Sequence, residues 1–334
     1  MTEGRGGAAE QAGAVADPYD REAMLAEVVA GLRRPDKRIS SKYHYDEVGS
    51  ELFEQITRLD EYYPTRTERA LLERWMPVWV DELRPRSLVE LGAGSADKSR
   101  IILDAMVRHT PDALYVPVDV SGDFLYAVAE RLSEEYDELA VHPEVADMTG
   151  DLVIGTELSE PSWIALLGST LGNFASGGAT RLLRRMADKL RRGDRFLLGV
   201  DLKPGPGKSR ERLELAYNDP AGLTEEFSRN ILRVLNRELG SDFDLDAFRY
   251  VSFYNADEGR IETYQESTRD QVVRFPDGSE IVLAEGERIR TEISAKYDRA
   301  TVEELFADAD LAMDRWVEDA RAYYALVLAV PTGS

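Results

Sequence analysis

The stretch that decides the fold is Ser87-Leu-Val-Glu-Leu-Gly-Ala-Gly-Ser-Ala-Asp-Lys98, followed by Tyr115-Val-Pro-Val-Asp119. An apolar strand runs into a Gly-x-Gly turn, a helix follows, and a second apolar strand ends on a carboxylate. This order is typical of the first half of a Rossmann-like βαβ unit. Gly92 and Gly94 let the backbone approach a ligand closely because they have no Cβ atom. Asp119, at the tip of the second strand, is then placed to accept both hydroxyls of a ribose.

The residues around the turn indicate which nucleotide it binds. A dinucleotide site uses Gly-x-Gly-x-x-Gly/Ala, so that a helix N-terminus packs tightly and cradles a pyrophosphate. Here Asp97 stands at the sixth position and Glu90 precedes the turn, and both carboxylates would repel a pyrophosphate. S-adenosylmethionine (SAM) has a ribose, an adenine and a positive sulfonium but no phosphate. The turn therefore favours SAM over NAD, with a Gly-rich turn in another kind of α/β protein as the alternative.

The composition narrows the class of function. The chain of 334 residues has no Cys and only three scattered His, which argues against disulfides, thiol nucleophiles and a metal site. Its formal net charge of −22 argues against a nucleic-acid partner, because phosphate binding needs a basic surface. No segment is apolar enough to span a membrane, and the first 17 residues do not resemble a signal peptide. We expect a cytoplasmic, monomeric enzyme that acts on a small molecule without a membrane partner.

The alternation of predicted strands and helices between residues 87 and 201 is typical of a doubly wound parallel sheet. We therefore expect an α/β fold, with a Rossmann-like, SAM-dependent methyltransferase core and a second α+β substrate lobe. The predicted parts are a disordered lead (1–17), a helical cap (18–82), the SAM-binding core (83–203), an inserted substrate lobe (204–295) and a return to the core (296–334).

Capping residues and prolines predict where several helices begin. In the cap, we expect helices over residues 19–34, 54–59 and 67–82, with Tyr62-Tyr-Pro-Thr65 as a break between the last two. Near the end of the chain, Thr301-Val-Glu-Glu304 matches a capping box and predicts that a helix starts there.

Ligands of a parallel sheet bind beyond the carboxyl ends of its strands, so the residues after each strand are site candidates. Asp147 is placed to accept from an adenine amino group, with Met148 against the ring, although an ordinary turn aspartate fits the spacing as well. Lys98 could contact a methionine carboxylate or lie on a helix surface. The strand-end candidates are Gly92–Lys98, Asp119, Asp147, Gly168–Asn173 and Asp201.

Other polar and aromatic residues suggest how a methyl acceptor is held. Asn173 can donate to a carboxylate, or it can cap a helix. Glu292 and Ser294 alternate on a predicted strand, so both point to one face and can bind a two-nitrogen ring, or both face solvent. A group of aromatic residues either packs between cap and core or forms a cage that attracts a methylated cation. These are Tyr43, Tyr45, Phe53, Tyr62 and Tyr63.

Several longer strings resemble one family, the histidine-specific Nα-methyltransferases of ergothioneine biosynthesis (the EgtD family). The likeness covers nearly the whole chain after about residue 20. It implies three successive methyl transfers from SAM to the α-amine of L-histidine, giving trimethylhistidine (hercynine). The strings are Tyr45–Glu68, Leu88–Lys98, Leu167–Asn173, Asn236–Leu239 with Asp242–Phe248, and Thr291–Ser294.

The resemblance also implies roles for individual residues. Tyr45 is the candidate catalytic residue, and we expect it to orient the lone pair of the substrate amine. The implied SAM contacts are Gly92, Lys98, Asp119 and Asp147, to which we add Gly94 and Met148. The implied substrate contacts are Asn173 and Tyr217 on the carboxylate, Tyr45 and Phe53 around the amine, Gly168 and Tyr62 in the pocket wall, and Glu292 and Ser294 on the imidazole.

Two positions depart from the family pattern. Thr263, a predicted substrate contact that packs on the imidazole, stands where Met is expected in mycobacterial members, and Met148 stands where Phe is usual. Thr263 leaves open an Nα-methyltransferase for another amino acid such as tryptophan or tyrosine, against which Glu292 and Ser294 argue. A NAD-linked oxidoreductase is disfavoured by Asp97. A SAM-binding protein without catalysis is the more remote alternative.

Overall fold

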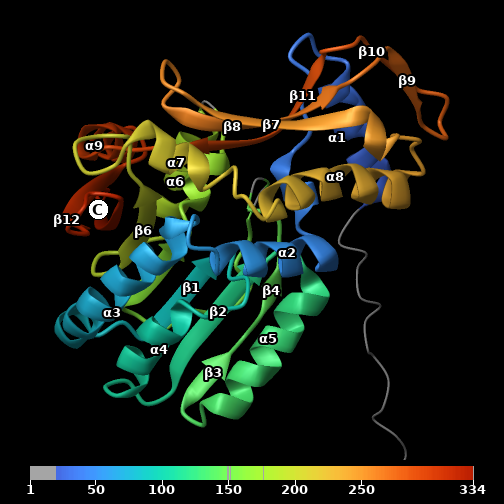
Figure 1. Ribbon diagram of the computed structural model, residues 1–334. Helices are drawn as coiled ribbons and strands as arrows, with labels where there is room; N and C mark the ends of the chain where they lie inside the picture. Colours follow the sequence, from blue (N-terminus) through green and yellow to red (C-terminus); the bar gives the residue numbers. More distant parts are fainter. Residues whose placement is uncertain (1–19, 149, 151, 176, 334) are drawn as a thin grey trace, which may run out of the picture.

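The computed structural model describes residues 20–148, 150, 152–175 and 177–333, so the predicted lead (1–17) lies outside the described residues. Its centre is an eight-stranded sheet in the order β12-β13-β6-β5-β1-β2-β3, with β4 paired to β2 (Figure 1). Strands β1 to β6 pair in parallel, whereas β13 runs antiparallel to both β6 and β12. The strands are β1 (Ser87–Leu91), β2 (Ala113–Asp119), β3 (Leu139–Val141), β4 (Glu144–Val145), β5 (Ser162–Leu166), β6 (Arg195–Asp201), β12 (Leu311–Glu318) and β13 (Tyr324–Pro331).

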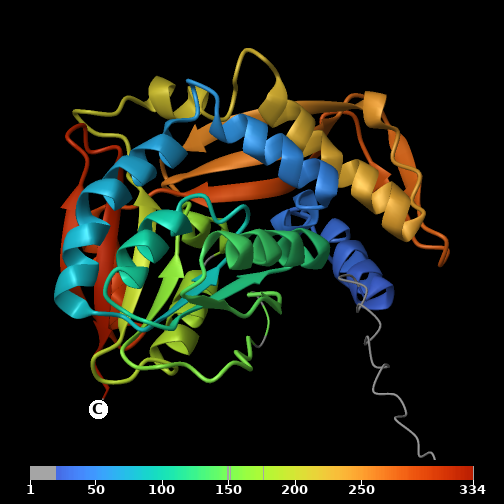
Figure 2. The same cartoon turned by 90° about the horizontal axis from the view of Figure 1, so that it is seen from below.

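Helices cover both faces of this sheet, which confirms the predicted Rossmann-like core (Figure 2). Successive residues of β1 enter different apolar clusters, Leu88 with α3, α4 and α5, and Val89 with α6 and α9. Both faces of the strand are thus buried, as is usual for parallel sheets. No helix in the described part of the chain is long and apolar enough to cross a membrane. The covering helices are α3 (Tyr63–Leu83), α4 (Ser99–Val107), α5 (Gly122–Glu135), α6 (Gly178–Ala187) and α9 (Arg299–Ala307).

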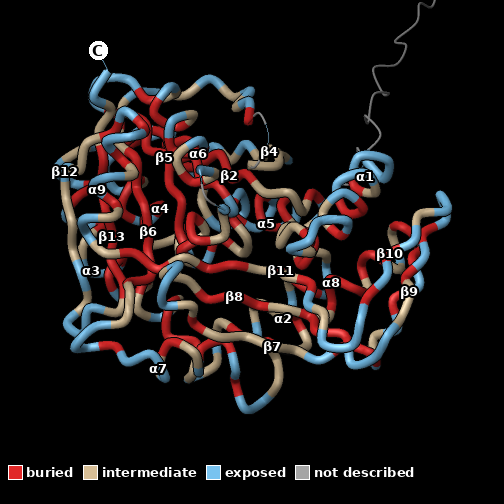
Figure 3. The backbone as a smooth tube through the Cα atoms, turned by 90° about the horizontal axis from the view of Figure 1, so that it is seen from above, coloured by how far each residue is buried: buried red, intermediate tan, exposed pale blue. Residues whose placement is uncertain are grey.

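A second layer lies beside the core and has its own three-stranded antiparallel sheet, in the order β11-β8-β7. Its apolar cluster joins α1, α8 and the β9–β10 hairpin, and Figure 3 shows this buried seam between exposed edges. Its elements are α1 (Arg21–Leu32), η1 (Ser41–His44), α2 (Glu47–Thr57), α7 (Arg210–Leu215), α8 (Leu223–Leu239), η3 (Leu245–Ala247), β7 (Phe248–Asn255), β8 (Arg260–Ser267), β9 (Gln271–Arg274), β10 (Glu280–Leu283) and β11 (Arg288–Ala295).

Two helices of the cap begin earlier than predicted. Helix α2 starts at Glu47, because the Asp46 carboxylate accepts the Gly49 N–H at 2.8 Å and caps it. Helix α3 starts at Tyr63, where a break was expected. Pro64 lies in its first turn, where a helix needs no N–H donor, so this proline begins the helix instead of ending one.

The predicted capping box at Thr301 was also wrong. Helix α9 begins at Arg299, and its cap is Asp298, whose carboxylate accepts the Thr301 N–H at 2.8 Å. An aspartate three residues upstream satisfies the free N–H groups of the first turn, so Thr301 lies inside the helix. The predictions also missed α7 and β12.

The joint between cap and lobe buries a histidine. His44 is 1% exposed, its ring stacks on Phe227 with centroids 4.8 Å apart, and its Nδ1 lies 3.0 Å from the Ser41 carbonyl oxygen. Burial lowers the pKa of His44 to about 4. The folded protein therefore keeps this imidazole neutral at pH values where an unfolded chain protonates it.

This burial predicts a loss of stability in mild acid. Because the folded pKa lies below the unfolded value of about 6.5, the full stability is present above pH 6.5 and falls as the pH drops toward 4. Between pH 7 and pH 4.5, the unfolding free energy of the parent should fall by about 2–3 kcal/mol more than that of His44→Gln. Urea unfolding at both pH values measures this difference. Equal losses in the two proteins would contradict it.

Candidate active site

A cleft of about 960 Å³ lies between the carboxyl ends of the core strands and the lobe. Its walls combine the loops after β1, β2, β4 and β5 with the start of α3 and with β11. All predicted cofactor residues line it, and so do all predicted substrate residues except Thr263. The predicted residues that line the cleft are Tyr45, Phe53, Tyr62, Gly92, Gly94, Lys98, Asp119, Asp147, Met148, Gly168, Asn173, Tyr217, Glu292 and Ser294.

The Gly-x-Gly turn has the backbone that its glycines predict. Gly92 and Gly94 have φ angles of +72° and +52°, a region that side chains disfavour. The turn is tied to the tip of β2, because the Asp119 carboxylate accepts the N–H groups of Gly94 and Ser121, each at 3.1 Å. Burial raises the pKa of Asp119. Its remaining lone pairs face the cleft as acceptors, the chemistry that a ribose diol needs.

Two buried glutamates lie beneath this turn. Glu90 accepts hydroxyl protons from Ser99 and Tyr115, and burial raises its pKa to about 7. Glu68, on α3, is fully buried and pairs with the ammonium of Lys98. It also accepts from the Gly168 N–H at 2.8 Å. Glu68 was not predicted, although a charged residue on the apolar face of α3 is a signal that could have indicated it.

A lysine that the sequence analysis missed reaches Asp147 in the cleft wall. The Lys42 ammonium lies 3.0 Å from Asp147 and 2.9 Å from Glu27 on α1. Asp147, the predicted adenine contact, is thus bridged to the first helix. Met148 lies against the Gly-x-Gly turn, because its Cε is 3.2 Å from the position that a Cβ atom on Gly92 would take.

Aromatic rings form the wall opposite the Gly-x-Gly turn. Phe53 meets Tyr45 and Tyr62 edge to face, with centroids 5.8 Å and 6.0 Å away, and Tyr62 meets Tyr217 at 6.2 Å. Burial raises the pKa of Tyr45 and of Tyr62 above the ordinary phenol value. Both phenols therefore stay protonated, and neither is a strong base.

Strand β11 brings Glu292 and Ser294 to the cleft together, on one face as their spacing predicts. Burial raises the pKa of Glu292 to about 7, against the opposing effect of the Lys296 charge. Thr263 lies opposite Glu292 on β8, but it is 1% exposed and its hydroxyl lies 3.2 Å from the Ser252 hydroxyl. Thr263 does not line the cleft, although it stands next to Glu292 in the sheet.

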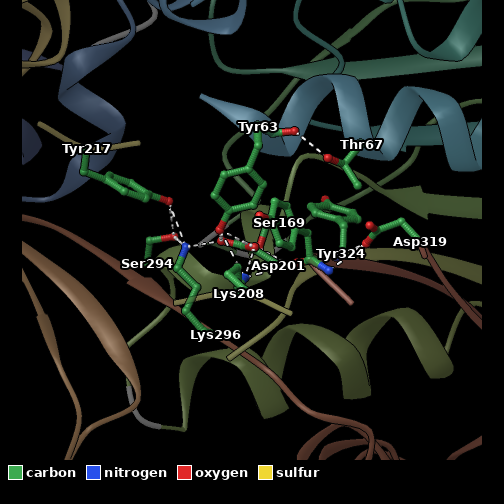
Figure 4. Close-up of polar contacts among 11 residues, drawn as sticks. Tyr63, Thr67, Ser169, Asp201, Lys208, Tyr217, Ser294, Lys296, Asp319 and Tyr324 are labelled. Atoms are coloured by element: carbon green, nitrogen blue, oxygen red, sulfur yellow. Dashed lines mark hydrogen bonds and ion pairs between the residues drawn. The ribbon is translucent and has the colours of Figure 1, made fainter. Parts of the chain in front are cut away.

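A buried charge cluster supports the same wall (Figure 4). The Asp201 carboxylate, a predicted strand-end candidate, lies 2.7 Å from the ammonium of Lys208 and 2.9 Å from that of Lys296. It also accepts the Tyr63 hydroxyl at 2.9 Å. Burial works against its charge, but the two ammonium groups lower the pKa of Asp201. Neither lysine was predicted, although Lys296 follows Ser294 by two residues and so shares its face.

Comparisons with known proteins show which sequence family the chain matches. A sequence profile of the family described as "Histidine-specific methyltransferase, SAM-dependent" matches residues 24–331. The chain is 38% identical over 314 residues to the histidine N-alpha-methyltransferase of Mycolicibacterium smegmatis, covering 92% of this chain and 95% of that protein. It is also 38% identical over 312 residues to the protein of that name from Mycobacterium tuberculosis, covering 92% and 94%. Ergothioneine biosynthesis protein 1 of Schizosaccharomyces pombe is 29% identical over 249 residues, covering 71% of this chain and 31% of that protein.

The cofactor side of the cleft leads to a prediction for Asp119. Asp119→Asn should weaken the binding of SAM by about tenfold or more, because an amide cannot accept both hydroxyls of a ribose. Isothermal titration of the purified variants with SAM measures this. Asp123→Asn is the matched control, since Asp123 lies exposed on α5, close in sequence but not in the cleft wall. Equal affinities for the two variants would remove Asp119 from the cofactor site.

Proposed function

The chain belongs to the family of histidine-specific, SAM-dependent methyltransferases, and we propose that it methylates the α-amine of L-histidine. Three successive transfers would give trimethylhistidine (hercynine), a step in ergothioneine biosynthesis. The observation that carries the proposal is that one cleft joins the Gly-x-Gly turn and Asp119 to the Glu292–Ser294 pair. The first half of that cleft suits a nucleoside with a cationic group, and the second suits a ring with two nitrogens.

On the cofactor side, we assign the ribose to Asp119 and the adenine to Asp147 and Met148. Lys98 would hold the methionine carboxylate, and its pairing with the buried Glu68 keeps its ammonium at that end of the cleft. Bound SAM supplies an electrophilic methyl group on its sulfonium. Glu90, beneath the turn, is a carboxyl group whose negative form would attract a sulfonium.

On the substrate side, Asn173 and Tyr217 would bind the carboxylate, and Glu292 and Ser294 would bind the imidazole. These contacts leave the α-amine near the aromatic wall of Tyr45 and its neighbours. The free amine is the nucleophile, and an α-amino group with a pKa of about 8 is only partly deprotonated at neutral pH. The enzyme's main task is therefore to align and desolvate this amine.

Tyr45 would orient the amine without taking its proton, because burial keeps the phenol protonated. The released proton would leave through water. The nitrogen becomes permanently cationic at the last transfer, and the faces of Tyr45, Phe53 and Tyr62 attract such a cation by about 0.5–2 kcal/mol. The wall that aligns the amine thus also favours the later, more methylated states.

The proposal also assigns each segment of the chain to substrate binding or to SAM binding. The cap (18–82) and the insertion (204–295) would form the substrate lobe, and residues 83–203 and 296–334 the SAM core. Tyr45 and Glu292, one from each lobe segment, support this by lining the same cleft as the Gly-x-Gly turn. We also propose a cytoplasmic monomer without nucleic-acid or membrane partners, for which the net charge of −22 speaks against phosphate backbones.

Mass spectrometry of the purified protein with SAM and a panel of free amino acids tests the reaction. Histidine should gain three methyl groups, with tryptophan and tyrosine unchanged. Methylation of another amino acid instead would keep the fold and the SAM site but overturn the substrate. Tight SAM binding without any turnover would indicate a SAM-binding protein.

Removing the ring contact should weaken substrate binding. Glu292→Ala should lower the affinity for histidine at least about tenfold, because the buried ring N–H loses its acceptor at a cost of ~1–3 kcal/mol. The variant's affinity for SAM serves as the internal control and should stay unchanged. A change in histidine affinity below about twofold would remove Glu292 from the imidazole site.

Removing the Tyr45 hydroxyl should affect transfer more than binding. Tyr45→Phe keeps the aromatic wall but can no longer orient the amine, so at least one of the three methylation steps should slow. Single-turnover measurements that follow the mono-, di- and trimethylated products separate these steps. Unchanged rates for all three would refute the role of Tyr45.

A further inference from the structure

We propose that Lys296 is a positioning residue that turns the hydroxyl protons of Tyr217 and Ser294 toward the substrate. Ser294 then donates a hydrogen bond to the ring of the substrate. This inference deepens the proposed function and rests on it. Figure 4 shows the arrangement, in which Lys296 lies between these two hydroxyls and Asp201. Lys296 is 2% exposed and does not line the cleft, although Tyr217 and Ser294, which it contacts, do.

Three oxygen atoms lie within hydrogen-bond distance of the Lys296 ammonium. Its Nζ lies 2.8 Å from the Tyr217 oxygen, 2.8 Å from the Ser294 oxygen and 2.9 Å from an Asp201 carboxylate oxygen. An ammonium has three N–H donors and no acceptor. Each of the three oxygens therefore receives one proton from Lys296, and none can donate to it.

The neighbours of Lys296 keep its amine protonated, and a protonated amine can only donate hydrogen bonds. Burial by itself would lower the pKa of Lys296, but the Asp201 carboxylate and the Tyr217 hydroxyl raise it above the ordinary lysine value. The other Asp201 oxygen lies 2.7 Å from Lys208, whose ammonium also donates to the Tyr323 carbonyl oxygen at 3.1 Å. Asp201 is thus held from both sides and keeps Lys296 charged and in place.

The two hydroxyls are left with a restricted choice. Tyr217 and Ser294 each accept from Lys296, and their oxygens lie 3.0 Å apart, a distance that one shared proton can bridge. Only one of their two protons fits that bond, so the other must point elsewhere. Both side chains line the cleft, and a ligand with an acceptor at each end can draw both protons toward it. Their oxygens then still accept from Lys296, so neither is left unsatisfied.

The direction of these hydrogen bonds determines which kind of substrate ring the site binds. Ser294 donates and Glu292 accepts in its ionised form, which predominates above its pKa of about 7, so the matching ring has one nitrogen with a lone pair and one N–H. Neutral imidazole has both, whereas an indole has an N–H but no acceptor nitrogen. A site built to bind a polar group rejects an analogue that lacks it, because the protein's own polar group stays unpaired. Lys296 thereby becomes a specificity determinant that does not touch the substrate.

The test compares Lys296→Met with Lys208→Met. Both variants remove a buried ammonium beside Asp201, but Lys208 contacts neither Tyr217 nor Ser294. For each protein, with SAM-derived S-adenosylhomocysteine bound, titration gives the dissociation constants of L-histidine and of 3-(2-thienyl)-L-alanine, whose five-membered ring has no nitrogen. The dissociation constant of the thienyl analogue divided by that of histidine measures how well the site discriminates between the rings. A uniform loss of binding leaves this ratio unchanged.

We expect Lys296→Met to lower this ratio at least tenfold and Lys208→Met to leave it within about twofold of the parent. Ser294→Ala should lower the ratio too, and adding Lys296→Met to it should change nothing more, because Lys296 acts through Ser294. Lys296→Arg is measured alongside. It keeps a charge next to Asp201, but its rigid fork cannot give one proton to each of three oxygens, so the ratio should also fall.

A parent-like ratio in Lys296→Met would overturn the inference, and so would full additivity with Ser294→Ala. If Lys296→Met does not fold, Lys296→Arg decides by the same criterion. These outcomes are separate from failure of the proposed function, because that failure appears in the parent protein, as no preference for histidine over the thienyl analogue and no methylated histidine.

Discussion

The buried carboxylate of Asp201 is the interaction on which the rest of the structure depends. It lies at the end of β6 in the core and binds Tyr63 from α3, Lys208 from the start of the insertion, and Lys296 from its end. A buried ion is tolerated when it is paired, and removing one partner of such a pair costs about 3–5 kcal/mol. Core, cap and lobe therefore meet at one carboxylate. Moving either lysine away would leave a buried charge with one partner fewer, and moving the cap away would remove the Tyr63 hydrogen bond.

The two ends of the cleft carry different groups. The carboxyl groups of Glu90 and Asp119 lie at the Gly-x-Gly turn, where we propose that the sulfonium binds, beside the Glu68–Lys98 pair. The Lys296–Asp201 pair lies toward the end proposed for the substrate carboxylate. Between them, the aromatic wall has low polarity but negative ring faces. A methyl cation equivalent thus passes from an acidic environment to a nitrogen that aromatic faces stabilise, without a charged base in the wall.

The sequence predicted the residues that follow the core strands better than the buried partners that hold them, for a physical reason. Carboxyl ends of parallel strands share one edge, so local patterns alone bring Gly92 and Asp119 together. Lys42 and Lys296 gain their roles from contacts between segments far apart in the chain, which no local pattern encodes. Thr263 was predicted to contact the substrate, but its short side chain does not reach the cleft. Its position in the sequence does not show how far the side chain extends. The start of α3 was missed because Pro64 can either end a helix or begin one.

The order of the strands in the sheet differs from their order in the chain, and this affects biosynthesis. Strand β6 pairs with β13, but the whole insertion (204–295) is encoded between them. At 5–20 residues per second, a ribosome needs roughly 6 to 25 seconds to pass from one to the other. Through that interval the apolar edge of β6 has no partner, and an unpaired edge invites strands from other chains. The yield of correctly folded protein should therefore depend on how fast the insertion is translated and on chaperones that cover this edge.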